Sequence, residues 1–329
     1  MDWAREWTDE QLEALEKRIA DAYSQAAEEA ARIEHAALKS YEREKMQFDA
    51  DLKAKRISKR DYNHWMRGKA AELTRHEGMV TELTSIAHNA NVAAAAMVND
   101  ELPRVFAENA NYAAFYVDQS LGKVTGFDLV NRDAVARLLV EDPDLLPKAF
   151  MDPVKDVTWN RQKFSSAITQ SILLGESVPH AVERLQNVVG MNERHATMLA
   201  RTALTGAENG GREHTYDRAR EKGIDTDYIW EATLDSRTRD SHIQLHGEVR
   251  DERTGEFSNG LKYPGDPNGS PEDVANCRCR LSAQVRGFAR RDYTSLSSQW
   301  SDLPSGATYE EWKAGKYSSR RDDAKRNKE

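Results

Sequence analysis

The chain has 329 residues, 39% of them hydrophobic, which is long enough for two domains with separate cores. Charged residues of both signs make up 31% of the chain and sum to −8, which excludes a general nucleic-acid coat, because such a coat gains affinity by neutralising phosphates. The mean hydropathy of −0.78 predicts thin cores and long exposed helices.

The sequence also lacks the features of a membrane or secreted protein. It has no apolar run of about 18 residues, and residues 1–11 have neither the basic start nor the apolar core of a secretion signal. Its two cysteines, Cys277 and Cys279, are too close in sequence to bridge each other without strain. We therefore expect free thiols, a reducing compartment and no contact with a membrane.

Residues 1–121 are predicted to form a long helical arm. Thr8, with Gln11 three residues on, has the pattern of a capping box, and apolar residues then recur at helical spacing to about residue 54. Ser58 is expected to cap a second helix that runs to about residue 98, which predicts a long hairpin. The hairpin is either a solvated stalk without a binding role or an arm that docks on a larger assembly.

Residues 122–165 are predicted to connect this arm to the rest of the chain. Pro103 is expected to kink or restart the helix before them, and Gly122 to end it. The connection contains a short turn, a helix over about 132–140 and a proline-rich stretch. A further helix is expected from near Asn160 to Gly175.

Two more helices are expected before residue 223. Ser177 is predicted to cap a short helix, and Asn192 or a neighbour to cap the next one, which ends at Gly223. Three glycines interrupt that last helix, and each costs about 1 kcal/mol relative to alanine. Either the helix breaks there or another backbone packs closely against it; the glycines are Gly206, Gly210 and Gly211.

Strand patterns begin at residue 228. Residues 228–234 alternate apolar and polar side chains, 235–240 form a polar turn, 241–246 a short helix, and 277–285 a returning strand. We assign residues 166–287 to this domain and 288–329 to an extended tail, whose end at 320–329 is expected to be disordered. The predicted fold is mainly α, with a long N-terminal helical hairpin, a helical body and a small, loop-rich α+β C-terminal module.

Four side chains in this module have the spacing of metal ligands. His242 and His246 are four residues apart and would share a helix face, and Cys277 and Cys279 are two apart and would share a strand face. Two imidazoles and two thiolates could hold one tetrahedral zinc ion. The alternative is two half-buried thiols and two surface or capping histidines, and C-x-C is not the usual C-x2-C zinc knuckle.

The charged turn at 235–240 has a catalytic and a structural interpretation. Asp235 or His242 could act as a general base, but no nucleophile motif or glycine-rich phosphate loop accompanies them. The structural interpretation, in which arginines hold carboxylates and carbonyls to fix the loop, is favoured. Glu42 and Glu44 match the E-x-E spacing of ADP-ribosylating enzymes, but they lie in a predicted helix without supporting elements, so we reject that assignment.

Four segments, taken together, resemble a known family. The segments ARTALTGAENGGREHTY, WEATLDSRTRDSHIQLHGEV, KYPGDP and NCRC, in this order and spacing, are similar to the Mu F-like head morphogenesis domain of tailed-phage minor head proteins. The resemblance covers about Ser166 to Val285. The family signature falls on Arg201, Thr202, Asn209, Trp230, Asp235, Arg237, Thr238, Arg239, His242, Gly247, Asn276, Cys277, Arg278 and Cys279.

This chain departs from the family at two positions. Family members often carry an acidic residue where this chain has His246, which weakens a ligand role for that histidine. They often carry another after the Arg201-Thr202 pair, where this chain has Ala203. A charge-based role at that position is therefore in doubt.

The resemblance implies a structural minor capsid protein, not an enzyme. Its location would be the virion, inside the head near the portal, after synthesis in the host cytoplasm. Its partners would be the portal protein, with the major capsid or scaffolding protein as further candidates, and incidental contact with packaged DNA. It would act in head morphogenesis, with packaging or ejection of the genome as a further role. The alternative is a zinc-dependent enzyme delivered with the phage genome.

Overall fold

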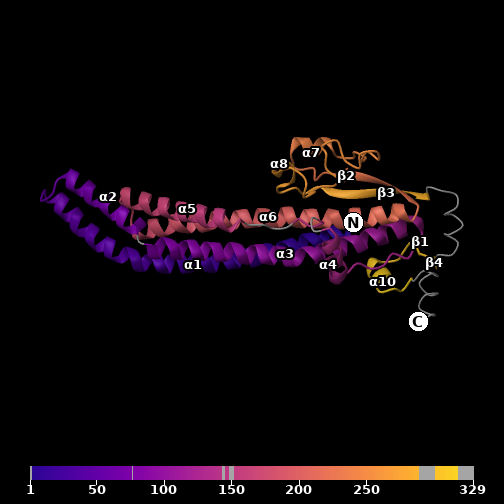
Figure 1. Ribbon diagram of the computed structural model, residues 1–329, viewed down its shortest axis with the longest axis horizontal. Helices are drawn as coiled ribbons and strands as arrows, with labels where there is room; N and C mark the ends of the chain where they lie inside the picture. The colour runs from indigo at the N-terminus through magenta and orange to yellow at the C-terminus, as the bar shows by residue number, and fades with distance from the viewer. Residues whose placement is uncertain (1, 76, 143–144, 148–151, 289–300, 318–329) are drawn as a thin grey trace. The chain divides into compact units, whose positions relative to one another are not determined.

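The computed structural model describes residues 2–75, 77–142, 145–147, 152–288 and 301–317. It is mainly helical with short antiparallel strands, which confirms the predicted fold class (Figure 1). No described helix is long and apolar enough to cross a membrane. The disorder expected at 320–329 lies outside the described residues. The chain divides into two compact units: unit 1 is Met1–Glu13, Val98–Ala149 and Met198–Glu329, and unit 2 is Ala14–Met97 and Phe150–Thr197.

Unit 2 is helical. It takes its residues from α1 (Trp3–Lys53), α2 (Lys59–Arg75), α3 (Glu77–Leu121), α5 (Pro153–Leu173) and α6 (Val178–Glu221). Ser58 caps α2 as predicted, because its hydroxyl accepts the backbone N–H of Asp61 at 3.1 Å. Side-chain amides link the helices: Asn192 of α6 donates to Asn160 of α5 at 2.9 Å, and Asn91 of α3 donates to Asn192 at 2.9 Å.

Two local predictions about helix ends were wrong, and a third was wrong in one of its two alternatives. Helix α1 begins at Trp3, and the Thr8 hydroxyl donates to the carbonyl of Ala4 at 2.8 Å from within the helix. Helix α3 continues through Pro103, so the restart, one of the two alternatives predicted there, does not occur. Asn192 does not start a helix, since α6 is one continuous helix and the Asn192 amide donates to the carbonyl of Val188. In the first and last cases the polar side chain bonds to the preceding turn, which lets it stay in the helix interior.

Unit 1 contains the strands. Strand β2 (Ile224–Glu231) pairs antiparallel with β3 (Arg280–Phe288), with Trp230 opposite Leu281. Residues 247–250 follow the other edge of β2, because Gly247 and Arg250 donate their backbone N–H groups to Trp230 and Tyr228. The short strand β1 (Lys123–Val124) pairs with β4 (Ser301–Asp302). The remaining described helices are α4 (Arg132–Glu141), α7 (Asp240–Gln244), α8 (Pro271–Val274) and α10 (Tyr309–Lys313).

The core of unit 1 forms where the strand pair meets α3 and α6. Trp230 and Leu281 are fully buried, and they lie in one apolar cluster with Phe115 of α3, Tyr216 of α6 and Trp312 of α10. Figure 1 shows β2 and β3 over α6 in this unit. The sheet is therefore covered by helices on the side that carries Trp230.

The glycines in α6 mark close packing, which was one of the two predicted alternatives. A Cβ on Gly211 would lie 2.3 Å from the carbonyl oxygen of Phe106 in α3, and one on Gly206 would lie 2.7 Å from the carbonyl oxygen of Gly265. No side chain fits at such distances. The glycines therefore permit α3 and the loop at 265 to contact the α6 backbone directly.

Candidate functional site

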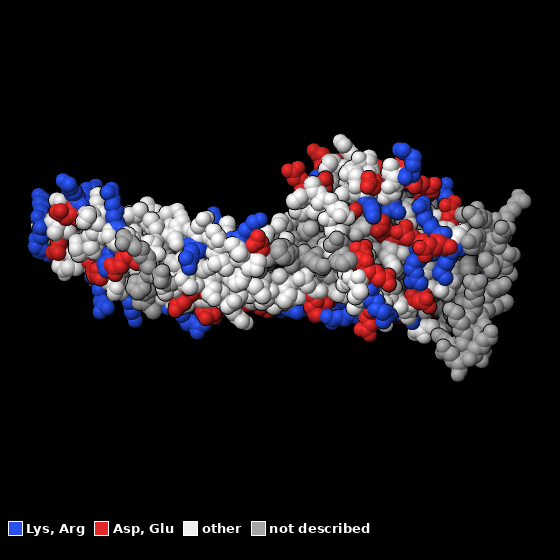
Figure 2. Space-filling model, in the orientation of Figure 1, with Lys and Arg blue, Asp and Glu red and all other residues white. Residues whose placement is uncertain are grey.

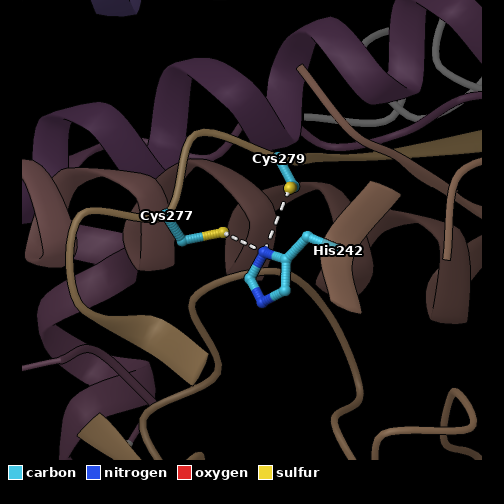
Figure 3. A group of neighbouring side chains, drawn as sticks. All are labelled: His242, Cys277 and Cys279. Atoms are coloured by element: carbon cyan, nitrogen blue, oxygen red, sulfur yellow. Dashed lines mark hydrogen bonds between the residues drawn. The ribbon is translucent and has the colours of Figure 1, made fainter. Parts of the chain in front are cut away.

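His242, Cys277 and Cys279 meet in the interior of unit 1. The Nδ1 atom of His242 lies 3.6 Å from Sγ of Cys277 and 3.4 Å from Sγ of Cys279, and the three ligand atoms all lie within 4.8 Å of one another. Each residue is only 2–3% exposed. Figure 3 shows both sulfurs directed at the same ring nitrogen. One nitrogen and two sulfurs thus converge on a common point that solvent does not reach.

The protonation of the two thiols differs because they lie side by side. The pKa of Cys279 is lowered, first because the Cys277 thiol hydrogen-bonds to the Cys279 sulfur and then because the His242 imidazole lies beside it. The same contact raises the pKa of Cys277, and its burial adds to that shift.

The backbone of the NCRC stretch is held by one face of α6. Thr202 accepts the N–H of Asn276 at 3.0 Å, and the Thr205 hydroxyl donates to the carbonyl of Cys277 at 2.9 Å. Asn209 donates to the carbonyl of Cys279 at 3.1 Å. Because 202, 205 and 209 are three and four residues apart, they lie along one side of the helix. Asn276 lies in the turn before Cys277 and has φ +55°, in the left-handed region.

Asn209 is the most connected residue of this face. It is fully buried, and its amide donates to the carbonyls of Thr205, Pro264 and Cys279. Its oxygen accepts the N–H of Leu281 at 2.7 Å. A single side chain thus joins α6, the loop at 264 and the first residues of β3. Sequence analysis selected Thr202 and Asn209 but missed Thr205, although its position between them on the same helix face was visible in the sequence.

Asp235 and Arg278 fix the charged turn. The two guanidinium nitrogens of Arg278 lie 2.5 and 2.6 Å from the two carboxylate oxygens of Asp235. Hydrogen bonds from Arg278 and from the backbone N–H of Arg237 hold the pKa of Asp235 well below its usual range. The Thr238 hydroxyl donates to the carbonyl of Thr233 in the same turn. This is the paired, planar geometry that suits an arginine fork.

The remaining signature residues occupy turns and packing positions. The Arg239 guanidinium donates to the carbonyl of Ala275 at 2.5 Å, which joins the start of α7 to the segment before Cys277. Gly247 has φ +82°, a left-handed conformation that favours glycine. Trp230 packs edge to face on the His242 ring, with centroids 5.4 Å apart. The Arg237 side chain is exposed, and Arg201 is half-buried in α6.

His246 lies apart from the other three predicted metal ligands. Helix α7 ends at Gln244, so the spacing of four residues no longer places His246 on the face of His242. Its Nδ1 accepts the backbone N–H of Ala232 at 3.2 Å, and the residue is exposed. The structure therefore brings together three of the four predicted ligand residues.

A buried ionic cluster lies at the first residue of β3, directly after Cys279, and it was not selected from the sequence. Arg212 of α6 is nearly inaccessible and holds the carboxylate of Asp2 at 2.9 and 3.1 Å. Arg280 contacts the same carboxylate at 2.6 Å. Although burial raises the pKa of Asp2, the two guanidinium charges lower it on balance. No local sequence motif indicates this cluster, because Asp2, Arg212 and Arg280 are far apart in the sequence.

Comparison with known proteins gives one family and two relatives. Residues 162–282 match the family described as Phage Mu protein F like protein. The minor head protein GP7 of Bacillus phage SPP1 is 28% identical over 197 residues, which cover 58% of this chain and 62% of that protein. The NAD(+)–arginine ADP-ribosyltransferase EFV of Enterococcus faecalis is 27% identical over 221 residues, which cover 63% of this chain and 42% of that protein. No solved structure matches the chain.

The match coincides with the site described above. It begins in α5, includes all of α6, β2 and α7, and ends at residue 282 in β3, so it contains every signature residue. The chain spans less than two thirds of the length of either relative. Residues 162–282 are therefore similar to the Mu F-like family of phage proteins, and the similarity extends to a phage minor head protein.

Proposed function

We propose that this protein is a structural minor head protein of a tailed phage, located inside the head at the portal and active in head morphogenesis. The observation that carries the proposal is the Mu F-like segment at residues 162–282, together with the similarity to a phage minor head protein. A role in genome packaging or ejection follows from that location and belongs to the same proposal.

The contacts of the signature residues support a structural role. Asn209 and Arg239 bond to backbone carbonyls of unit 1, and Arg278 neutralises Asp235. These contacts satisfy the polar groups of a loop-rich module that has few regular hydrogen bonds. In this interpretation the signature preserves the shape of the module, which a binding partner then recognises.

The helical arm supplies a surface for the portal protein. Within unit 2, a groove of about 600 Å³ runs between α1 and α3, and small side chains line much of it, including Ala22, Ala26, Ala90 and Ala93. Small residues let the backbone of another helix approach closely. We therefore assign this groove to a helix of the portal protein.

Co-expression with the portal protein of the same phage tests this assignment. Ala22 and Ala93 are half-buried in the groove, so Ala22→Arg with Ala93→Arg would block it while the helices remain folded. Ala96 is exposed on α3 outside the groove lining, which makes Ala96→Arg the matched control. We expect the double variant to lose co-purification with the portal protein and the control to retain it. Equal co-purification of both would refute the groove as the docking site.

Contact with packaged DNA is expected to be weak and local. On the face of unit 1 shown in Figure 2, basic and acidic side chains are interspersed, whereas basic side chains gather where α1 passes into α2. The exposed residues there include Lys53, Lys55, Arg56, Lys59 and Arg60. Because the net charge of the chain is −8, the rest of the molecule repels DNA. A filter-binding assay at about 0.15 M salt should detect little retained duplex.

The second candidate is a zinc-dependent enzyme delivered with the genome, and the His–Cys cluster is the observation that favours it. Two features count against it. His242 is only 2% exposed, so a substrate has no access, and the Glu42–Glu44 pair lies within α1, where Glu44 pairs with Lys69. A phage carrying His242→Ala separates the candidates: defective heads support the structural role, whereas normal particles that fail after ejection support the enzyme.

A further inference from the structure

The positions of His242, Cys277 and Cys279 fit the bond lengths of a bound zinc ion. With zinc–sulfur bonds of about 2.3 Å, zinc–nitrogen bonds of about 2.0–2.1 Å and tetrahedral angles, sulfur and nitrogen ligands lie about 3.6 Å apart. The two sulfur–nitrogen distances here are 3.4 and 3.6 Å. The protein therefore holds the imidazole nitrogen at the distance from both sulfurs that tetrahedral coordination needs.

Contacts independent of any metal position the two sulfurs. The carbonyls of Cys277 and Cys279 both bond to α6, through Thr205 and Asn209, which fixes the backbone on either side of Arg278. Residues two apart on an extended chain direct their side chains to the same face. Although C-x-C is shorter than the usual C-x2-C spacing, both sulfurs can bind one ion here, because α6 and not the metal holds the backbone in the required geometry.

The imidazole is oriented as a ligand by its own surroundings. Arg239, at the start of α7, bonds to the carbonyl of Ala275 and so fixes α7 next to the NCRC stretch. Trp230 packs against the ring at an interplanar angle of 81°. As Figure 3 shows, Nδ1 faces the sulfurs and Nε2 points away from them. Coordination through Nδ1 requires that tautomer, with the proton on Nε2.

We propose that His242 Nδ1, Cys277 Sγ and Cys279 Sγ bind one zinc ion. Nitrogen and sulfur donors without a carboxylate are typical of zinc and do not suit magnesium or calcium. Because the three residues are buried, the ion is structural: it joins α7 to the start of β3 and closes the chain between residues 242 and 277. The proposal does not depend on the role in head assembly.

The test starts with the metal content of the full-length protein, purified under reducing conditions without chelator. We expect about one zinc per chain by inductively coupled plasma mass spectrometry. The protein stripped of metal and titrated with Co²⁺ under argon should develop thiolate-to-cobalt charge-transfer absorption that saturates at one equivalent. Well under half an equivalent of zinc together with no such absorption would overturn the proposal, as would copper in place of zinc.

Paired histidine variants test the ligand set. His246 is exposed, lies four residues from His242 and contacts the backbone of Ala232, so His246→Ala should keep full zinc content. His242→Ala should lose at least nine tenths of the zinc, and Cys279→Ser should lose the charge-transfer band. Circular dichroism should show that the helices of these variants remain. Equal zinc content in the two histidine variants would refute the assignment of His242 as a ligand.

Discussion

The side-chain oxygen of Asn209 accepts a 2.7 Å hydrogen bond from the backbone N–H of Leu281, a residue 72 positions later in the chain. Replacing Asn209 with alanine leaves that N–H and the carbonyls of Pro264 and Cys279 without their partner in the core. We expect Asn209→Ala to lower the free energy of unfolding by about 3 kcal/mol. Urea unfolding followed by tryptophan fluorescence measures this loss. Asn187→Ala, at an exposed position of α6, is the control and should change stability little.

Two glycines of α6 should respond oppositely to substitution by alanine. A Cβ at Gly211 meets the Phe106 carbonyl at 2.3 Å, whereas a Cβ at Gly190 meets nothing within 4 Å. Gly190→Ala should stabilise the protein by about 0.5–1 kcal/mol through helix propensity. Gly211→Ala should destabilise it by about 2–3 kcal/mol, because α3 must move away. Thermal unfolding of both variants compares them directly, and a stabilising Gly211→Ala would contradict the close packing.

Glu34 should make unit 2 less stable at alkaline pH. It is 1% exposed, and its burial raises the pKa to about 8 from a usual value of 4.5. The folded protein therefore holds a proton that the unfolded chain releases, so stability falls as pH rises from about 4.5 to 8. The slope is at most about 1.4 kcal/mol per pH unit.

Glu34→Gln should remove this dependence, because the glutamine amide does not titrate. Urea unfolding at pH 6 and pH 8.5 should show a smaller loss of stability for the variant than for the original protein. Glu29→Gln, at an exposed position of the same helix, should behave as the original protein does. Parallel pH profiles for Glu34→Gln and the original protein would contradict the prediction.

The pair of Asp235 and Arg278 should control the mobility of the turn at 233–239. In Asp235→Ala the N–H of Arg237 loses its acceptor and Arg278 loses its partner. Hydrogen–deuterium exchange should therefore accelerate at residues 233–239. Asp251→Ala is the control. It removes a similar turn carboxylate, which bonds to the N–H groups of Arg253 and Thr254, so exchange should accelerate in the turn at 251–254 and stay unchanged at 233–239. Unchanged exchange at 233–239 in Asp235→Ala would show that the ion pair does not hold the turn.

The fold class was predictable because its signals are local and repeated. Apolar residues at helical spacing marked the long helices, and the alternating pattern at 228–234 marked a strand, which the structure places at Ile224–Glu231. Helix ends were less predictable. Thr8 and Asn192 have the residue types of caps, yet Thr8 accepts a bond from Asn109 and Asn192 bonds to Asn160. Asn109 and Asn160 lie far from Thr8 and Asn192 in the sequence, so no local pattern predicts these bonds.

The candidate site could be predicted only in part, because spacing along the chain shows which side chains share a face only while the helix or strand continues. The spacing of Cys277 and Cys279 indicated a shared face, and the structure directs both sulfurs to His242. The spacing of His242 and His246 indicated a shared face only if the helix continued, and α7 ends first. The cluster of Asp2, Arg212 and Arg280 could not be predicted, because it depends entirely on the tertiary fold.

The salt bridge between Asp2 and Arg280 also constrains the order in which the chain can fold during synthesis. The two residues are 278 positions apart, so the start of α1 must wait for nearly the whole chain to leave the ribosome before its carboxylate is paired. Unit 2, by contrast, is complete once residue 197 has emerged. We infer that unit 2 forms first and that docking of residues 2–13 is a late and slow step.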